Sequence, residues 1–254
     1  MIRKYRGKIK PLENLKEISM MLLSDKNYRK QLKDYETNQF DVRFHTIEDN
    51  LFMLAVATPK APSLERADSD KDYAKIISNI ATRVACSGAR HIATTNEDDT
   101  KVGILGKIDD PKEVMKMSFR QKGDTIYLVG KYDSNPYSES SAHTLTQIRK
   151  VIKRGLISSA HAIASNGIFL TLLESCIPNR LGFDITSDGE MSDKEFLFED
   201  SDYLAIVSVN LDQENDLVEY LYAQGIPVVL LGHVTKGELR VDDFSFGDIG
   251  AYLV

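Results

Sequence analysis

The chain has 254 residues, of which 42% are hydrophobic and 28% are charged, and its formal net charge is −6. This composition is typical of a folded globular protein and excludes disordered and collagen-like classes. The negative charge gives no long-range attraction to nucleic acid or to an acidic membrane surface, and no stretch approaches the roughly 20 apolar residues of a membrane-spanning helix. We therefore expect a protein that binds neither nucleic acid nor a membrane.

The first 39 residues are predicted to form a helical arm with a basic start. MIRKYRGKIK contains five Lys and Arg residues, and the polar sequence after it lacks the apolar run and cleavage site of a signal peptide. This decapeptide is typical of a solvated arm or an edge strand. Leu15, Ile18, Met21 and Leu22 then recur at helical spacing, which predicts one or two short helices.

Residues 40–107 are predicted to form a small lobe of strand, strand, helix, strand and strand. FDVRFHTI and LFMLAVAT flank a turn-prone EDN, as in a pair of neighbouring strands. A helix is expected from about 70 to 87, because apolar residues fall on one face and Gly88 supplies a stop. ARHIATT and KVGILGKI then predict two further strands.

Residues 108–254 alternate between strands and helices. After a short amphipathic segment, strands are predicted at TIYLVGKYD, LGFDITS, DYLAIVSV, IPVVLLGHVT and in a terminal ELRVDDFSF pair. SAHTLTQIRKVIKRG and SSAHAIASNGIFLTLLESC are expected to be successive helical segments that separate at Gly155, and NLDQENDLVEYLYAQG to be a helix that ends at Gly225. The alternation predicts an α/β or α+β layered fold, with a small mixed β lobe followed by an α/β sandwich.

The cysteines and histidines indicate a reducing compartment and no structural zinc. Cys86 and Cys176 stand alone in apolar contexts, and no histidine belongs to a metal-binding motif. We expect a cytoplasmic protein whose cysteines are small core residues.

Several motifs resemble one enzyme family in their order as well as their residues. VGILGKIDDPKEVMKMSFRQKGDTIYLVGK is similar to the V-G-x-x-G-x-I-x-D … G-D-x-I-Y-L-x-G stretch of phosphoribosylformylglycinamidine (FGAM) synthases. GLISSAHAIASNGIF resembles their G-L-x-x-S-A-H-D-x-S-x-G-G-L signature, and SNIATRVACSGARHIATTN, FLFEDSDYLAIVSV and GIPVVLLGHVT resemble three further segments. The chain is identified as a short and divergent member of the superfamily that also contains aminoimidazole ribonucleotide (AIR) synthetase, selenophosphate synthetase and a hydrogenase maturation factor.

The resemblance carries specific implications for fold and chemistry. It implies a truncated AIR-synthetase-like N-terminal domain at 40–107 and an AIR-synthetase-like C-terminal domain at 108–254. It also implies ATP-dependent activation of an amide or formyl oxygen with Mg²⁺, followed by attack of ammonia. A homodimer with a shared β-barrel, and a larger partner in purine synthesis, are further expectations.

The departures from the family pattern concern charge. Where the family has His-Asp this chain has His161 and Ala162, and where it has an acidic residue before Gly-Gly this chain has Asn166 before Gly167. Magnesium needs hard oxygen ligands, usually carboxylates, beside phosphates. The long, glycine-rich acidic insertion that the family carries between TTNEDD and KVGILG is also missing here.

The resemblance and the local chemistry together select the candidate site residues. His161 is the candidate catalytic residue, with a satisfied packing histidine as the alternative. Substrate or nucleotide binding is assigned to Lys107, Ser165, Asn166, Gly167 and Glu199, and metal binding to Asp68 and Asp72. The acids near 68–72 are also explained as helix N-cap and first-turn residues, and Glu199 as a solvated turn residue.

Three functions remain open from the sequence. The first is an FGAM-synthase-related protein of purine biosynthesis type that is degenerate at the ATP and Mg²⁺ site. The second is an active ATP-dependent ligase that amidates formylglycinamide ribotide. The third is a non-catalytic protein that binds a nucleotide or ribotide, or that serves as a scaffold.

Overall fold

The protein contains two β-sheets and the helices that pack on them. The structure, a computed structural model, describes residues 40–47, 50–57, 70–97, 101–133, 135, 137–163, 167–198 and 201–252. The predicted arm at 1–39 lies outside these residues. Within the described ranges, no helix is long and apolar enough to cross a membrane.

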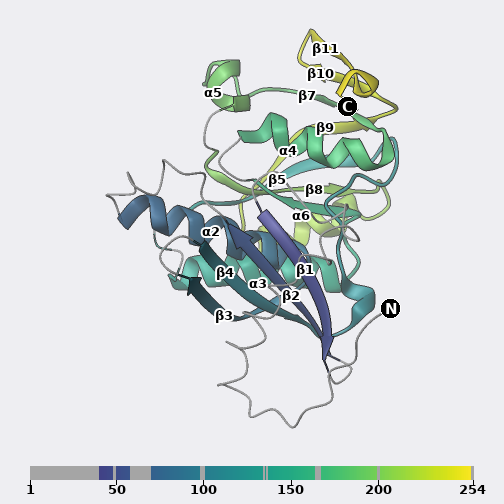
Figure 1. The fold of residues 1–254 in the computed structure, drawn as a ribbon. Coiled ribbons are helices and arrows are strands. Elements are labelled where there is room, and N and C mark those ends of the chain that lie inside the picture. Colours follow the sequence, from purple (N-terminus) through teal and green to yellow (C-terminus); the bar gives the residue numbers. More distant parts are fainter. Residues whose placement is uncertain are drawn as a thin grey trace.

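The smaller sheet has four antiparallel strands. They are β1 (Phe40–Ile47), β2 (Asn50–Ala57), β3 (Arg90–Glu97) and β4 (Lys101–Ile108), in the order β1-β2-β4-β3. The helix α2 (Asp70–Cys86) connects β2 to β3 and packs on one face of this sheet (Figure 1). The predicted order of strands and helix in this part of the chain is confirmed.

The larger sheet has seven strands in the order β11-β10-β7-β9-β5-β8-β6. Its pairs are antiparallel except for β7 and β10, which run parallel. The strands are β5 (Thr125–Lys131), β6 (Ser159–Ala162), β7 (Gly182–Ile185), β8 (Tyr203–Val209), β9 (Val228–Thr235), β10 (Glu238–Val241) and β11 (Phe244–Asp248).

Helices cover both faces of the larger sheet, which places its central strands in the core. The α-helices are α3 (Glu139–Lys153), α4 (Gly167–Cys176), α5 (Asp193–Phe198) and α6 (Glu214–Ala223), and short 3-10 helices lie at η2 (Pro111–Glu113), η3 (Ile177–Asn179) and η4 (Ile249–Tyr252). Successive side chains of a strand point to opposite faces. In β5, Ile126 and Leu128 accordingly pack under α4 and α5, whereas Tyr127 and Val129 pack against α3 and α6.

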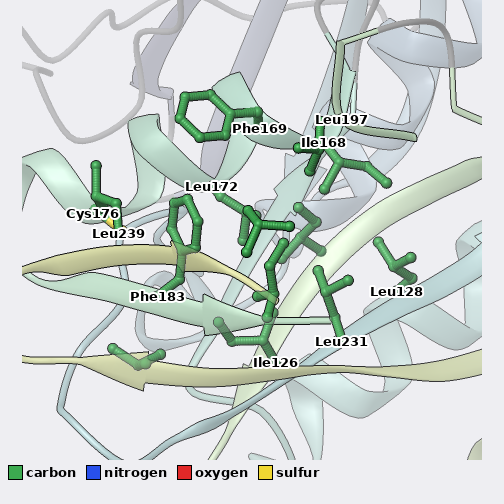
Figure 2. Packing of buried hydrophobic residues seen from close by; sticks show 14 of the residues in the cluster. Ile126, Leu128, Ile168, Phe169, Leu172, Cys176, Phe183, Leu197, Leu231 and Leu239 are labelled. Atoms are coloured by element: carbon green, nitrogen blue, oxygen red, sulfur yellow. The ribbon is translucent and has the colours of Figure 1, made fainter. Parts of the chain in front are cut away.

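The core under α4 is built from branched and aromatic side chains of the helix and the sheet. Figure 2 shows Leu172 of α4 together with Phe183, Ile126 and Leu231 of the strands below it. Phe169 and Phe183 meet edge to face with ring centroids 5.7 Å apart, an arrangement that aromatic pairs favour. The predicted layered α/β fold is confirmed.

The helix α2 is buried on all sides along its second half. Ile77, Ile80 and Val84 pack on the four-stranded sheet, while Ala85 and Cys86 join the core that α3 and α6 form on the larger sheet. The helix also lies against β6 and β8. Both sheets therefore share α2 as a packing element.

One secondary-structure prediction is wrong. The segment 159–162 is the edge strand β6, paired with β8, and not part of a helix. Ser159, Ala160, His161 and Ala162 are all buried. The small side chains of Ala160 and Ala162 let α2 approach one face of the strand, while α4 covers the other face. The helix begins only at Gly167, whose φ of 78° places it in the left-handed region that glycine tolerates best.

Candidate functional site

The candidate site lies where β6 meets α4. His161 is on the face of β6 that carries Ser159, whose hydroxyl oxygen lies 2.7 Å from that of Ser208 on β8. Ile206, the residue opposite His161 on β8, belongs to the core under α4. His161 therefore points toward α4.

Both ring nitrogens of His161 lie beside polar groups of α4. Nδ1 lies 3.1 Å from the carbonyl oxygen of Thr171 and 3.0 Å from Oγ of Ser175. Nε2 lies 3.3 Å from a carboxylate oxygen of Glu174. The His161 side chain is only 2% exposed and that of Glu174 11%, so the ring connects the edge strand to the helix within the protein interior.

The hydrogen-bond network assigns the proton on Nδ1. The Ser175 hydroxyl donates to the Thr171 carbonyl over 2.9 Å, so its oxygen accepts from the ring. Nδ1 is therefore the donor, and Nε2 faces Glu174. The Thr171 hydroxyl in turn donates to the Gly167 carbonyl over 2.9 Å. Hydrogen bonds through Thr171 and Ser175 of α4 therefore connect the predicted residues His161 and Gly167.

Ala162 lies on the opposite face of β6 from His161. It pairs with Ala205 of β8, and both belong to the core that contains Ala85 and Cys86 of α2. A carboxylate at this position, as in the family signature, would therefore face α2 rather than α4. Ala162 is 2% exposed and offers only a methyl group.

Polar side chains of α2 are buried on the part of the helix that is turned away from the four-stranded sheet. Ser78, Asn79, Thr82 and Arg83 are all buried there, and the Thr82 hydroxyl donates to the Ser78 carbonyl over 2.8 Å. Arg83 is the largest fully buried side chain among the described residues. In the sequence these residues appear as polar breaks in an otherwise apolar helix.

Lys107, another predicted residue whose side chain the structure describes, does not join His161. Lys107 of β4 is half-buried and pairs with Phe52 and Arg90 in the smaller sheet. Its neighbours Gly106 and Ile108 face α2, so Lys107 points to the other face of that sheet. Asp72 belongs to α2, but its side chain is outside the description.

Four predicted residues, Asp68, Ser165, Asn166 and Glu199, lie outside the described residues. Among the residues that the structure does describe, no group of three or more His, Cys, Asp or Glu side chains is placed to hold a metal ion.

The partners of His161 were missed by sequence reasoning. Thr171, Glu174 and Ser175 stand in an otherwise apolar helix, and the spacing of Thr171 and Ser175 places them one turn apart on one face. A polar stripe at that spacing inside LTLLES was the available signal.

No family model matches the chain. Its sequence is 30% identical over 162 residues to the phosphoribosylformylglycinamidine synthase subunit PurL of Carboxydothermus hydrogenoformans, covering 55% of this chain and 22% of that protein. The PurL subunit of Cutibacterium acnes is 28% identical over 164 residues, with 56% and 22% covered. The chain is a divergent relative of FGAM synthase.

Solved structures of PurL and of another protein share the fold of this chain. Thermotoga maritima PurL complexed with FGAR superposes with a TM-score of 0.66 at 12% identity, over 82% of this chain and 47% of that one. A protein from Thermus thermophilus superposes with a TM-score of 0.53 at 12% identity, over 80% and 90%. The AIR-synthetase-like fold expected from the sequence is confirmed. The sequence match spans about a fifth of the curated PurL relatives, and the superposition spans about half of the Thermotoga maritima PurL chain.

Proposed function

We propose that the chain is a non-catalytic FGAM-synthase relative in purine biosynthesis, which keeps the fold and has lost the ATP and Mg²⁺ site. The observation that carries the proposal is the position of Ala162. The family signature has an aspartate there, on the face of β6 that packs against α2, and this chain has a buried methyl group.

The state of His161 supports the same conclusion. A histidine that contacts a phosphate or a reacting oxygen needs a ring nitrogen available for that contact. Here Nδ1 is used by Thr171 and Ser175, and Nε2 faces Glu174. His161 is therefore proposed to hold β6 against α4, and not to act as a catalyst.

The described residues do not fit a magnesium ion bound to phosphates. Magnesium is held by one or two carboxylates together with phosphate oxygens and water. Asn166, where the family has an acid, has at most a neutral amide to offer. Arg83 of α2 is a buried cation, and a cation repels a divalent metal rather than binding it.

Thermal shift with nucleotide tests the proposal directly. Thermotoga maritima PurL has been solved with ATP, ADP and AMPPCP, so that protein is the positive control. A ligand at 100 times its Kd stabilises a native protein by about 2.7 kcal/mol. We expect no shift for this chain at millimolar ATP and Mg²⁺, and no ADP release with formylglycinamide ribotide and ammonia. A saturable ATP shift together with ADP release would overturn the proposal.

The ribotide alone separates the two non-catalytic alternatives. A shift with formylglycinamide ribotide but not with ATP would identify a ribotide-binding protein, whereas no shift with either ligand leaves the scaffold role. The PurLQS structure from Thermotoga maritima is among the fold neighbours, and we propose that this chain likewise assembles with a second copy or with a larger purine-synthesis protein. Light scattering of the purified chain, alone and mixed with that partner, measures the assembly, and a chain that stays monomeric in both would contradict it.

A further inference from the structure

An aromatic ridge runs from α4 to the β11 edge of the seven-stranded sheet. It is formed by Phe198 of α5, Phe169 of α4, and Phe246 and Phe244 of β11. Successive ring centroids are 5.2, 4.8 and 5.0 Å apart. Phe169, inside the ridge, lies in the core. The two end residues reach solvent, because Phe198 is 48% and Phe244 65% exposed.

Exposed carboxylates are frequent in the segments that carry the outer residues of this ridge. The segments 182–198 and 236–252, which contain or flank its outer residues, carry nine acidic and three basic side chains. All nine acids are exposed. Asp184 and Glu238 alternate with core residues of their strands and therefore point to the face of the sheet away from the ridge. The other seven are Asp188, Glu190, Asp193, Glu195, Asp242, Asp243 and Asp248. Arg240, one of the three cations, is already paired with Glu238 at 2.8 Å.

Exposed aromatic faces among carboxylates match the chemistry of cationic side chains. Arg and Lys bind the faces of aromatic rings through cation–π attraction and bind carboxylates through charge-assisted hydrogen bonds. The cation–π contacts found among the described residues lie elsewhere, at Tyr132, Tyr203 and Tyr220. The ridge therefore has the features of a surface for a basic segment with apolar side chains.

We propose that the occupant is the chain's own N-terminal decapeptide, MIRKYRGKIK. Its five Lys and Arg residues complement the charge of the exposed carboxylates, and Ile2, Tyr5 and Ile9 supply apolar groups for the exposed rings. Residues 11–39 give it sufficient reach, since about 3.3 Å per extended residue far exceeds the roughly 18 Å radius of gyration of a chain of this size. Docking within one copy or onto a second copy satisfies the same chemistry.

A single tryptophan reporter tests this docking in the full chain. The sequence contains no tryptophan, so Phe244→Trp places a unique fluorophore on the ridge with an aromatic ring retained. A matched control is Tyr222→Trp on α6, where the side chain is 82% exposed and lies across the sheet from the ridge. Each reporter is then combined with Arg3→Glu, Arg6→Glu and Lys8→Glu in the decapeptide.

The expected result is a red shift and stronger iodide quenching of the reporter at position 244 when the decapeptide charge is reversed, with no change at position 222. High salt should reproduce the effect, since exposed charges are screened at molar ionic strength. An unchanged reporter at position 244 would overturn the proposal.

Peptide competition identifies the occupant. The charge-reversed chain should bind synthetic MIRKYRGKIK, and Phe198→Ser together with Asp243→Asn should weaken that binding about tenfold or more, the scale on which interface substitutions act. A scrambled peptide of the same composition should bind less tightly. Equal binding of both peptides would mean that the ridge takes any basic segment and would overturn the assignment, and light scattering distinguishes docking within one copy from docking between copies.

Discussion

The two edges of the seven-stranded sheet differ in whether their polar and aromatic side chains are buried or exposed. At the inner edge, β6 is enclosed by α2 and α4, and His161 is bonded by groups of the protein itself. The outer edge is formed by β11 (Figure 1), and there Phe244 and several carboxylates are exposed. The described polar groups of the inner edge therefore face other groups of the protein, whereas those of the outer edge are exposed to solvent.

A charge inserted at the inner edge should have the largest effect on the unfolding free energy. Ala162→Asp would bury a carboxylate in the apolar core beside α2, and an uncompensated buried charge costs about 3 to 5 kcal/mol of unfolding free energy. Ala142→Asp is the matched control, because Ala142 is exposed near the start of α3, where acids complement the helix dipole. Urea unfolding measures both. Equal stability of the two variants would show that the α2 side of β6 still accommodates an anion.

Removal of the His161 ring should cause the second-largest loss of stability. His161→Ala removes its hydrogen bonds to α4 and leaves a cavity, so we expect a loss of about 2 to 3 kcal/mol. His233→Ala, at an exposed position of β9, should change stability by less than about 0.5 kcal/mol. If the two variants denature at the same urea concentration, His161 is not holding β6 to α4.

Truncation of Phe244 at the outer edge should lower the unfolding free energy least. Phe244 is mostly exposed, so Phe244→Ala should change the unfolding free energy by no more than about 0.5 kcal/mol while it weakens decapeptide binding. Thermal unfolding and the peptide titration measure the two effects on one sample. A stability loss as large as that of His161→Ala would show that the ridge is part of the core and not a surface for recognition.

The two cysteines report on the inner edge from its two sides. Burial raises the pKa of the Cys86 thiol to about 12, although Arg83 acts in the opposite direction, and burial also raises the pKa of Cys176. Because the thiolate is the reactive form, neither should react with iodoacetamide at neutral pH. In His161→Ala, labelling of Cys176 on α4 should rise first, as peptide mass analysis would show. Equal rates at both cysteines would indicate global unfolding instead of local release of α4.

The sequence was sufficient for the regular elements and insufficient for contacts between distant ones. Strong periodicity predicted α2 and most strands correctly. It failed at 159–162 because small residues such as Ala and Ser, with His161 among them, suit a helix as well as a closely covered strand. The opposite orientations of His161 and Ala162 follow from that strand, so a helical interpretation hides them. The aromatic ridge was equally hidden, since Phe169, Phe198, Phe244 and Phe246 meet only in the folded chain.

The position of α2 limits how the chain can be divided. A cut after β4 leaves each sheet with its own strands, yet Ala85 and Cys86 would be withdrawn from the core under α3 and α6. Buried Arg83 and Asn79 would become exposed on one fragment, and the apolar surface that Ala85 and Cys86 cover would become exposed on the other. A protein built in this way is expected to unfold as one cooperative unit, and fragments that follow its sheet boundaries are expected to aggregate or to bind each other.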